Sequence, residues 1–404
     1  MEQAFVDAKP ILNTLKKHGF EAYFVGGAVR DAIMGKEVHD VDIATSANPE
    51  TVQSLFMHVI PVGVEHGTVI VRFNDQSYEV TTFRKEANYH DYRHPDHVTF
   101  IDDLHEDLKR RDFTMNALAM TSEGDLIDPF SGQKDIEKRI IRTVGSPYER
   151  FREDPLRMLR ALRFMSQLNF TLEENTLSAI KKMAPYLSHL SIERIAQEFE
   201  KLMLGRACEK ALVQLLKLQI HVHLPCLSKQ TRALERLTTL PVSRLENDRE
   251  IWALLLLVTN MKPEPFLKAW KRSNQLSNDV KAILRELRND DLSIWDPYRF
   301  YRLGYPLSIS YIKLRTMIDR DHRNLDACLK KAHDLYKALP IKNRSELAVN
   351  GNDFVALFNK KPGKWLGEML QKAERAVVQG EVANDERELK EWGKRWLNRS
   401  EKNC

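Results

Sequence analysis

The chain has 404 residues, of which 43% are hydrophobic and 29% are charged. A chain of this length exceeds what one hydrophobic core usually organises, and its apolar content excludes a mainly disordered protein. The net charge of +5 is a small excess of 62 basic over 57 acidic residues, which permits a polyanionic partner without demonstrating one. The longest apolar run, residues 251–258, is far shorter than the roughly 20 residues of a membrane span. Four widely spaced cysteines are typical of reduced thiols, so we expect a multidomain, cytoplasmic protein without a membrane partner.

The pattern of hydrophobic residues along the sequence changes near residue 145. Before it, short runs rich in β-branched and aromatic residues are bounded by Gly, Asn and Asp, which is typical of strands. After it, apolar residues recur every three or four positions through long stretches rich in Leu, Lys, Glu and Arg, which predicts helices. We therefore predict an α/β head followed by an all-α remainder. Within the head, the polar and His-rich residues 88–98 predict a mobile loop.

Two aspartates stand two positions apart, at Asp40 and Asp42, directly before the β-prone residues 43–45. Such a triplet alone more often marks a turn or a solvated strand than a metal site. Here the context predicts a strand on which both carboxylates point to the same face. Two carboxylates at that separation repel each other and favour a neighbouring cation, and oxygen ligands suit Mg²⁺. We predict that Asp40 and Asp42 bind Mg²⁺.

A glycine turn precedes the aspartates. Residues 24–25 predict a strand, Gly26 and Gly27 a tight turn, and residues 28–34 a helix that ends at Gly35. Glycines let backbone N–H groups approach a phosphate closely, and Arg30 adds a charge-assisted hydrogen bond. A simple corner with a locally paired arginine explains these residues equally well when they are taken alone. Their nearness to the aspartates favours a triphosphate site, because phosphoryl-transfer centres combine these two parts.

A third carboxylate, Glu79, lies in the β-prone residues 78–84. This run predicts a strand that pairs beside Val41, which would bring Glu79 to the two aspartates. We therefore predict Asp40, Asp42 and Glu79 as catalytic residues of a two-metal centre. In such a centre one ion activates the attacking hydroxyl and the other holds the triphosphate, with the ions about 3.5–4 Å apart.

A second cluster spans residues 109–117, Lys-Arg-Arg-Asp-Phe-Thr-Met-Asn-Ala. The plain explanation is a charged helix start with Asp112 as its cap. In a nucleotide site, Arg111 reaches a phosphate, and Asp112 or Asn116 bonds the ribose hydroxyls and so excludes deoxynucleotides. Both explanations stay open on the sequence alone.

A third cluster begins with a predicted helix start at Asp154 and Pro155. Four charged residues spaced by three form a stripe along this helix: Asp154, Arg157, Arg160 and Arg163. Cytosine and adenine present an amino donor beside a ring-nitrogen acceptor, whereas uracil and guanine present a carbonyl beside an N–H. A carboxylate from Asp154 with the guanidinium of Arg157 therefore admits C and A. The alternative is that Asp154 only caps the helix, and the two roles are compatible.

These segments stand in the order of a known family. The motifs at 26–31, 40–42, 110–117 and 153–157 resemble those of class II CCA-adding enzymes of bacterial type, which are tRNA nucleotidyltransferases of the polymerase β nucleotidyltransferase superfamily. The resemblance covers roughly the first 165 residues. Residues 191–198 resemble the family's next helical motif, in which Glu193 and Arg194 have a structural, bracing role, and residues 350–354 and 361–367 resemble its tail.

The resemblance implies an α+β head with the mixed β-sheet of the nucleotidyltransferase fold, followed by all-α domains. It also implies an elongated, seahorse-like arrangement of four domains. These are a catalytic head at 1–137, a helical neck for nucleotide recognition at 138–206, a helical body at 207–331 and a tRNA-binding helical tail at 332–404. It implies Mg²⁺ on Asp40 and Asp42, and seven residues on the incoming nucleotide: Gly27, Arg30, Arg111, Asp154, Arg157, Arg160 and Arg163. The implied reaction is template-independent addition of C, C and A to the 3′ end of tRNA from CTP and ATP, with no DNA partner.

Other functions compete with this one. Bacterial poly(A) polymerases share the head and neck motifs, and CC-adding enzymes lack the flexible head loop that residues 88–98 predict here. A catalytically silent RNA-binding helical protein is disfavoured by the intact Asp40 and Asp42. A His-Asp phosphohydrolase is disfavoured because His333 and Asp334 have no partner histidines at a suitable helical spacing.

Overall fold

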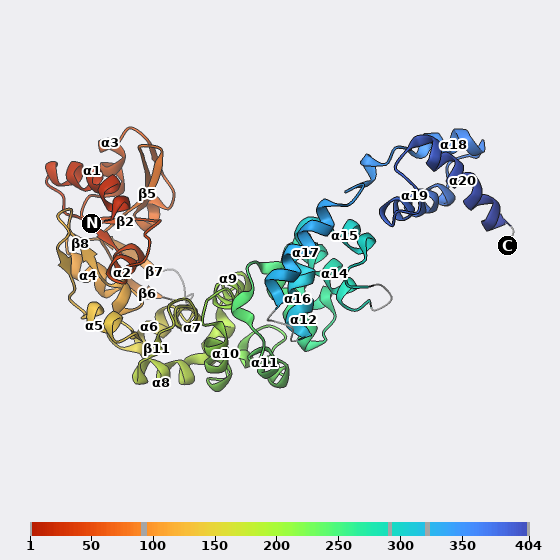
Figure 1. The fold of residues 1–404 in the computed structure, drawn as a ribbon. Helices are drawn as coiled ribbons and strands as arrows, with labels where there is room; N and C mark the ends of the chain where they lie inside the picture. The colour runs from red at the N-terminus through yellow and green to blue at the C-terminus, as the bar shows by residue number, and fades with distance from the viewer. Residues whose placement is uncertain (1, 90–94, 290–292, 320–323, 402–404) are drawn as a thin grey trace. The chain divides into compact units, whose positions relative to one another are not determined.

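The computed structural model describes residues 2–89, 95–289, 293–319 and 324–401. The chain divides into two compact units, Met1–Arg244 and Leu245–Cys404 (Figure 1). Among the described residues, all strands lie in the first unit, and the secondary structure of the second unit is helical. This confirms the predicted fold class of a mixed-sheet head followed by helices.

The first unit is built on a seven-stranded sheet in the order β3-β4-β5-β2-β1-β8-β9. Neighbouring strands are antiparallel except β2 and β5, which pair in parallel, so the sheet is mixed as predicted. The strands are β1 (Ala22–Val25), β2 (Asp42–Thr45), β3 (Val59–Ile60), β4 (Thr68–Phe73), β5 (Gln76–Thr82), β8 (Ala119–Met120) and β9 (Leu126–Ile127).

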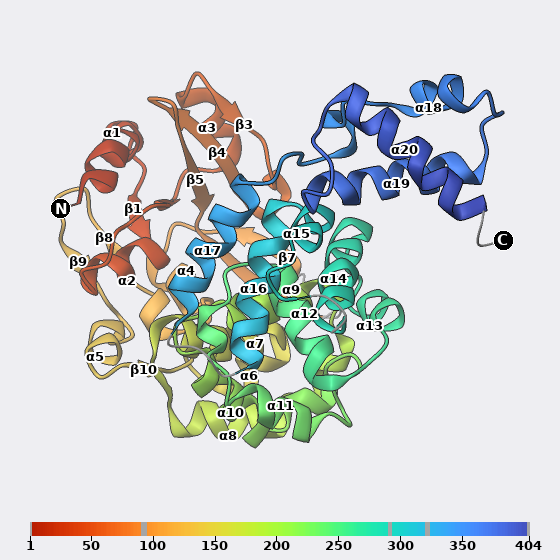
Figure 2. The same cartoon turned by 45° about the vertical axis from the view of Figure 1, so that its right-hand side comes forward.

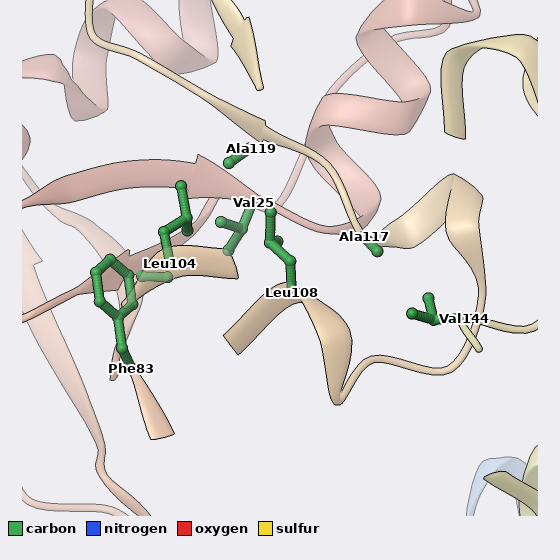
Figure 3. Packing of buried hydrophobic residues seen from close by; sticks show 8 residues of the cluster. Val25, Phe83, Leu104, Leu108, Ala117, Ala119 and Val144 are labelled. Atoms are coloured by element: carbon green, nitrogen blue, oxygen red, sulfur yellow. The ribbon is translucent and has the colours of Figure 1, made fainter. Parts of the chain in front are cut away.

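Helices cover both faces of this sheet because its inner strand β1 is apolar on both sides. Phe24 packs on Phe5 of α1 (Gln3–Lys17), with ring centroids 5.0 Å apart. The next residue, Val25, points to the opposite face, where it joins a buried cluster with Leu104 and Leu108 of α4 (Leu104–Lys109) (Figure 3). Helix α4 therefore lies over the same face of the sheet as Val25.

The segment at 88–98 differs from the predicted loop. Strand β6 (Arg84–Tyr89) and strand β7 (Pro95–Phe100) pair as an antiparallel hairpin, so both ends of the predicted loop are strands. The two strands pair from Arg84 opposite Phe100 to Tyr89 opposite Pro95. Residues 90–94 of the predicted loop lie outside the described residues.

The rest of the first unit is helical. Beside α1 and α4 it contains α2 (Gly27–Ile33), α3 (Pro49–Leu55), α5 (Gly132–Glu137), α6 (Pro147–Glu153), α7 (Leu156–Leu168), α8 (Glu174–Met183), α9 (Ile192–Met203), α10 (Cys208–Lys217) and α11 (Thr231–Leu237). A short parallel pair joins β10 (Ile140–Ile141) to β11 (Thr171–Leu172). The predicted helix start at Asp154 is confirmed, because the Asp154 carboxylate accepts a hydrogen bond from the backbone N–H of Leu156 at 3.0 Å.

Helix α7 carries the charged stripe, and its other faces are packed. It lies against α9 and α10 (Figures 1 and 2), and it buries Leu159, Leu162 and Met165. At the α9–α10 corner, a Cβ on Gly205 would lie 2.0 Å from the hydroxyl oxygen of Ser166 on α7. This close approach requires glycine at position 205, and it fixes α7 against the two helices.

The second unit is a set of packed helices. These are α12 (Asp248–Thr259), α13 (Pro263–Ala269), α14 (Asn274–Leu287), α15 (Pro297–Leu303), α16 (Tyr305–Ile318), α17 (Leu325–Lys337), α18 (Gly351–Phe358), α19 (Lys364–Val378) and α20 (Glu386–Glu401). The apolar run 251–258 lies within α12, which packs against α14 and α16. Within the described residues, none of the helices combines the length and apolarity that crossing a membrane requires.

We expect Gly205→Ala to lower the free energy of unfolding of the first unit by about 1–3 kcal/mol, because the added methyl group overpacks the crossing with Ser166. Hydrogen exchange of peptides from the first unit measures this change. All six tryptophans lie in the second unit, so tryptophan fluorescence in urea reports that unit separately.

The matched control is Gly367→Ala, in α19, where a Cβ meets no atom within 4 Å. This variant should stabilise its helix by up to about 1 kcal/mol. Equal effects of the two substitutions would contradict the packing argument at Gly205.

Candidate active site

One pocket of about 740 Å³ lies in the first unit, where the sheet meets α7. Nine of the eleven predicted site residues line it: Gly27, Arg30, Asp42, Arg111, Asp112, Asp154, Arg157, Arg160 and Arg163. Glu79 lines a smaller adjacent pocket of about 210 Å³, which also contains Asp42. Asp40 lines neither of these two pockets. The fold thus gathers residues from four separate segments of the sequence around one cavity.

Asp42 and Glu79 are brought together by the strand register. Asp42 is the first residue of β2, and in the parallel ladder it lies opposite Glu79 of β5. On its other side it pairs with Val25 of β1, so its side chain points to the face covered by α4. This pairing of the two strands agrees with the sequence prediction for Glu79.

The prediction that Asp40 shares the strand with Asp42 was wrong, because β2 begins only at Asp42. Residues 36–41 form an irregular, extended approach to the strand. The ladder does not extend back to Asp40, because the partner strand β1 ends at Val25, opposite Asp42. Asp40 is exposed, yet its charge still acts on the carboxyl group of Asp42.

The pKa of Asp42 is raised to about 6, first by partial removal of its carboxyl group from water and next by the negative charge of Glu79. Asp40 adds to the shift, whereas the positive charge of Arg111 opposes it. Ionisation of Asp42 is therefore less favourable than that of an ordinary aspartate, and a cation beside the carboxylate would stabilise its charged form.

A divalent cation fits this donor set. The carboxylates are hard oxygen ligands, and their mutual repulsion is relieved by a positive ion between them. In the part of the chain that the structure describes, there is no cluster of three or more His, Cys, Asp or Glu side chains in metal-binding geometry. A hard cation that keeps water or phosphate oxygens as further ligands matches a site with so few protein donors.

The glycine turn lies against these carboxylates. Gly26 has a φ of +73°, and a Cβ on it would lie 3.0 Å from Nη1 of Arg111 and 3.8 Å from Oδ2 of Asp42. Any side chain at position 26 would therefore be strained by the positive φ and would crowd the guanidinium group of Arg111. Helix α2 follows directly and begins at Gly27, one residue earlier than predicted.

Asp112 connects the sheet to α7 through a chain of hydrogen bonds. Its buried carboxylate accepts from Nδ2 of Asn116 at 3.0 Å and forms an ion pair with Arg160 at 2.6 Å. The side-chain oxygen of Asn116 in turn accepts from Nη1 of Arg30 at 2.6 Å. This chain holds the guanidinium groups of Arg30 and Arg160 on one wall of the pocket.

Burial alone would raise the pKa of the Asp112 carboxyl group. The positive charge of Arg160 and the hydrogen bond from Asn116 outweigh burial and lower this pKa to about 2. Asp112 is therefore ionised at neutral pH, and the helix-cap explanation of this residue does not account for its contacts.

The other arginines of the stripe are held by acids that the sequence analysis did not assign to the site. Arg163 forms an ion pair with Glu198 of α9 at 3.1 Å, and Arg157 forms one with Glu153 at 2.7 Å. Three guanidinium groups, those of Arg30, Arg160 and Arg163, lie 4.3–5.6 Å from the ring centroid of Phe164. The aromatic face and the acids allow these cations to sit side by side.

Asp154 is paired with Arg194 of α9 at 2.7 Å. Arg194 lines the pocket as well, so its bracing of Asp154 takes place inside the cavity. The Asp154 carboxylate thus has two protein donors, Arg194 and the backbone of Leu156, and a carboxylate has room for further ones.

The sequence analysis missed several lining residues: Arg84, Arg110, Leu156, Phe164, Gln167 and Lys201. Arg110 stands inside a motif that was quoted, so its position beside Arg111 was a usable signal. Arg84 begins β6 two residues after the strand of Glu79 ends, and its place in the run 78–84 was a weaker signal. Lys201 and Glu198 lie on α9, and only the packing of α9 against α7 reveals their role.

We expect Asp112→Asn to lower the free energy of unfolding of the first unit by about 2 kcal/mol at pH 7, because Arg160 loses a buried ionised partner. The folded pKa of Asp112 lies near 2, below the unfolded value of about 3.9. Its stabilising effect is therefore complete above pH 4 and is lost as the pH falls toward 2.

Hydrogen exchange of the first unit from pH 7 downward measures this effect. The difference between wild type and Asp112→Asn should shrink as the pH falls below about 4. A difference that stays constant, or grows, across this range would show that the Asp112 charge does not stabilise the fold.

Comparisons with known proteins agree with this geometry. Residues 22–142 match the family model described as the poly A polymerase head domain, residues 169–230 match the probable RNA and SrmB-binding site of polymerase A, and residues 243–392 match tRNA nucleotidyltransferase domain 2. The head model alone does not separate poly(A) polymerases from tRNA nucleotidyltransferases, whereas the match at 243–392 favours the latter.

The full-length relatives are more specific. The CCA-adding enzyme of Enterococcus faecalis is 45% identical over 402 residues, covering 98% of each chain. The CCA-adding enzyme of a Bacillus cereus strain is 46% identical over 391 residues, covering 96% of this chain and 98% of its own. The crystal structure of the Bacillus stearothermophilus CCA-adding enzyme in complex with CTP superposes with a TM-score of 0.91, at 41% identity and with 100% of both chains covered. The chain therefore belongs to the family of CCA-adding enzymes, the tRNA nucleotidyltransferases.

Proposed function

We propose that this protein adds C, C and A to the 3′ end of tRNA from CTP and ATP without a nucleic-acid template. In each step the 3′-oxygen of the RNA forms a bond to the α-phosphorus of the nucleotide. The bond from that phosphorus to the bridging oxygen breaks, pyrophosphate leaves, and the 3′-hydroxyl gives up its proton.

The observation that carries this proposal is the composition of the 740 Å³ pocket. Its volume is within the range of about 300–1,000 Å³ that is usual for ligand sites. One end holds the Asp42 carboxylate, and the walls hold the guanidinium groups of the α7 stripe. A triphosphate matches the cations, and the reacting phosphorus then lies next to the carboxylates.

Five groups are proposed to bind the sugar and phosphates: Gly27, Arg30, Arg111, Arg160 and Arg163. The ion pairs with Asp112 and Glu198 orient two of these arginines before the nucleotide enters, which reduces the entropy lost on binding. Asp112 also remains the candidate acceptor for a ribose hydroxyl, because its carboxylate lines the pocket.

We propose that Asp154 and Arg157 recognise the base. They lie about one turn apart at the N-terminal end of α7, and both line the pocket. Arg157 donates to Glu153 and to the backbone oxygens of Arg150 and Arg110, so its guanidinium is held in place. Arg194 does the same for Asp154. A rigid acceptor and donor pair discriminates well, because neither group can turn to suit the wrong base.

Mg²⁺ is the proposed metal, held by Asp40 and Asp42 with Glu79 as the third catalytic carboxylate. When bound, it would supply Lewis-acid activation of the attacking hydroxyl and neutralise the charge on the leaving pyrophosphate. The carboxylates Asp42 and Glu79 contribute the negative field that selects a divalent cation at this position.

The division into domains 1–137, 138–206, 207–331 and 332–404, with the tail on tRNA, is likewise proposed. The boundary between the two compact units falls after Arg244, inside the proposed body. Action in the cytoplasm is also proposed, because tRNA is the substrate. A poly(A) polymerase is the second candidate, favoured by the head match at 22–142 alone.

The decisive experiment incubates the purified protein with tRNA lacking its 3′-terminal CCA, Mg²⁺ and each nucleoside triphosphate, singly and together. Product length on a sequencing gel distinguishes three nucleotides, two nucleotides and a long A tract. A long A tract would contradict CCA addition, and two nucleotides with CTP and ATP present would indicate a CC-adding enzyme.

We expect Asp42→Ala to reduce nucleotide transfer by about three orders of magnitude or more, because a group that acts directly on the reacting atoms is lost. Filter binding should show unchanged affinity for tRNA, and the circular dichroism spectrum should match that of wild type. Glu50→Ala, an exposed carboxylate of α3, is the control and should retain full activity. Substantial incorporation by Asp42→Ala would exclude the catalytic role of Asp42.

We expect Asp154→Ala to relax the exclusion of UTP and GTP by about 1–3 kcal/mol, which corresponds to roughly 5- to 150-fold in kcat/KM. The reason is that the acceptor for the base amino group is removed. Competition between CTP and UTP in single-turnover reactions measures the ratio. Glu149→Ala, an exposed carboxylate of α6, should leave the ratio unchanged. Unaltered discrimination in Asp154→Ala would refute the proposed recognition pair.

A further inference from the structure

The smaller pocket beside Asp42 is a separate cavity with its own chemistry. It has a volume of about 210 Å³ and is lined by Thr68, Glu79 and Thr81, none of which lines the larger pocket. The two cavities share Asp42 and the arginines Arg84, Arg110 and Arg111. Asp42 therefore stands between two spaces, and Glu79 opens only into the smaller one.

The pleat of the sheet puts the polar groups of this cavity on one face. Glu79 and Thr81 are two residues apart on β5, and Thr81 lies opposite Thr68 of β4 in the ladder. The alternate residues Tyr78 and Val80 are buried on the other face. The sheet thus presents carboxylates and, about 6.5 Å further along the strand, a pair of hydroxyl groups.

The two threonine hydroxyls are hydrogen-bonded to each other at 3.1 Å. One hydroxyl proton serves this bond, which leaves a second proton and several lone pairs for a ligand. A hydroxyl group on the ligand that both donates and accepts is the natural partner for such a pair.

Arginine side chains form the rim of the cavity. Arg110 is held by Asp107 of α4 at 2.7 Å, and Nη1 of Arg84 donates to the backbone oxygen of His66. The backbone N–H of Arg84 also donates to Asp107, at 3.3 Å. The two guanidinium groups at the rim can bind a phosphate, and the hydroxyls and carboxylates deeper in the cavity can bind sugar hydroxyl groups. This combination matches a sugar phosphate.

We infer that this cavity binds the 3′-terminal ribose and its 5′-phosphate of the acceptor RNA, an assignment that rests on the proposed function. Asp42 and Glu79 lie at the 3′-hydroxyl, the Thr68–Thr81 pair bonds the 2′-hydroxyl, and Arg84 and Arg110 bind the phosphate. The cavity is much smaller than the nucleotide pocket, and its size suits one sugar-phosphate unit better than a whole nucleoside triphosphate. The shared Asp42 places the acceptor next to the α-phosphorus of the nucleotide in the larger pocket.

The Thr68–Thr81 pair is thereby a determinant of RNA over DNA at the acceptor end. Loss of one hydrogen bond is worth about 0.5–1.5 kcal/mol, or about 2- to 12-fold in affinity. Thr81→Val keeps the shape of the side chain and removes its hydroxyl. It should raise the KM for tRNA lacking CCA by that factor, while the Kd of CTP measured without RNA stays at the wild-type value.

Combining a change in the RNA with a change in the protein makes this test specific. An acceptor whose terminal nucleotide is 2′-deoxy should lose about 2- to 12-fold in KM with wild type and nothing further with Thr81→Val. Thr68→Val should behave like Thr81→Val, and Thr99→Val, an exposed threonine of β7, should behave like wild type. An equal 2′-deoxy penalty in wild type and in both valine variants would overturn the assignment.

The phosphate contact has an independent readout. Arg84→Gln should raise the KM for RNA by about tenfold or more and lower the slope of log KM against log salt concentration by about one. The control Arg72→Gln, at an exposed arginine of β4, should leave both quantities unchanged. An unaltered KM and salt slope in Arg84→Gln would remove this residue from the acceptor site.

Failure of the acceptor site and failure of the proposed function give different results. Wild type that adds no nucleotide at all would contradict the proposed function itself, whereas normal addition without these shifts in KM and salt slope would contradict only the acceptor site.

Discussion

The repulsion between the carboxylates of Asp42 and Glu79 is the constraint on which the site depends. The parallel register of β2 and β5 places them opposite each other, and the charge of Glu79 contributes to raising the pKa of Asp42 to about 6. A fold that needed only stability would not place two acids there. The register therefore favours positive charge at this position. The guanidinium group of Arg111 supplies part of it, and a divalent cation would supply more when bound.

Arginines around the pocket balance this negative charge, and each of these arginines is held in place by an acidic residue. Asp107 holds Arg110, Asp112 holds Arg160, and Glu198 holds Arg163, each through an ion pair of 3.1 Å or less. These acids keep the guanidinium groups close together in the absence of a ligand, and they leave other N–H donors facing the cavity. The nucleotide site is thus preorganised by ion pairs whose acidic members lie on α4, on α9 and in the segment after α4.

One face of the sheet serves both substrates in the arrangement that we propose. The side chains of Val25, Asp42 and Glu79 lie on one face of the sheet, with Val25 in the core under α4 and the two acids at the catalytic centre. The Thr68–Thr81 pair lies on the same face. The apolar part of the face anchors α4, and α4 delivers Arg110 and Arg111 at its end. Packing and chemistry are therefore coupled. If the leucines of α4 packed differently against the sheet, the arginines that line both cavities would move.

Local pattern predicted the α/β head, the helical remainder and the helix start at Asp154, because periodicity and caps act over a few residues. Motif spacing also identified half of the residues that line the larger pocket. The sequence did not reveal that β2 begins only at Asp42, since the length of a ladder depends on its partner strand. It missed the hairpin formed by β6 and β7 for the same reason. It could not predict that Glu198 holds Arg163 or that Arg84 joins the cavity, because these contacts link residues that are neighbours only after α9 packs on α7 and β5 packs beside β2. The sequence determined which charges are available, and the tertiary structure decided which of them meet, since a side chain's partner is set by long-range packing and not by its distance along the chain.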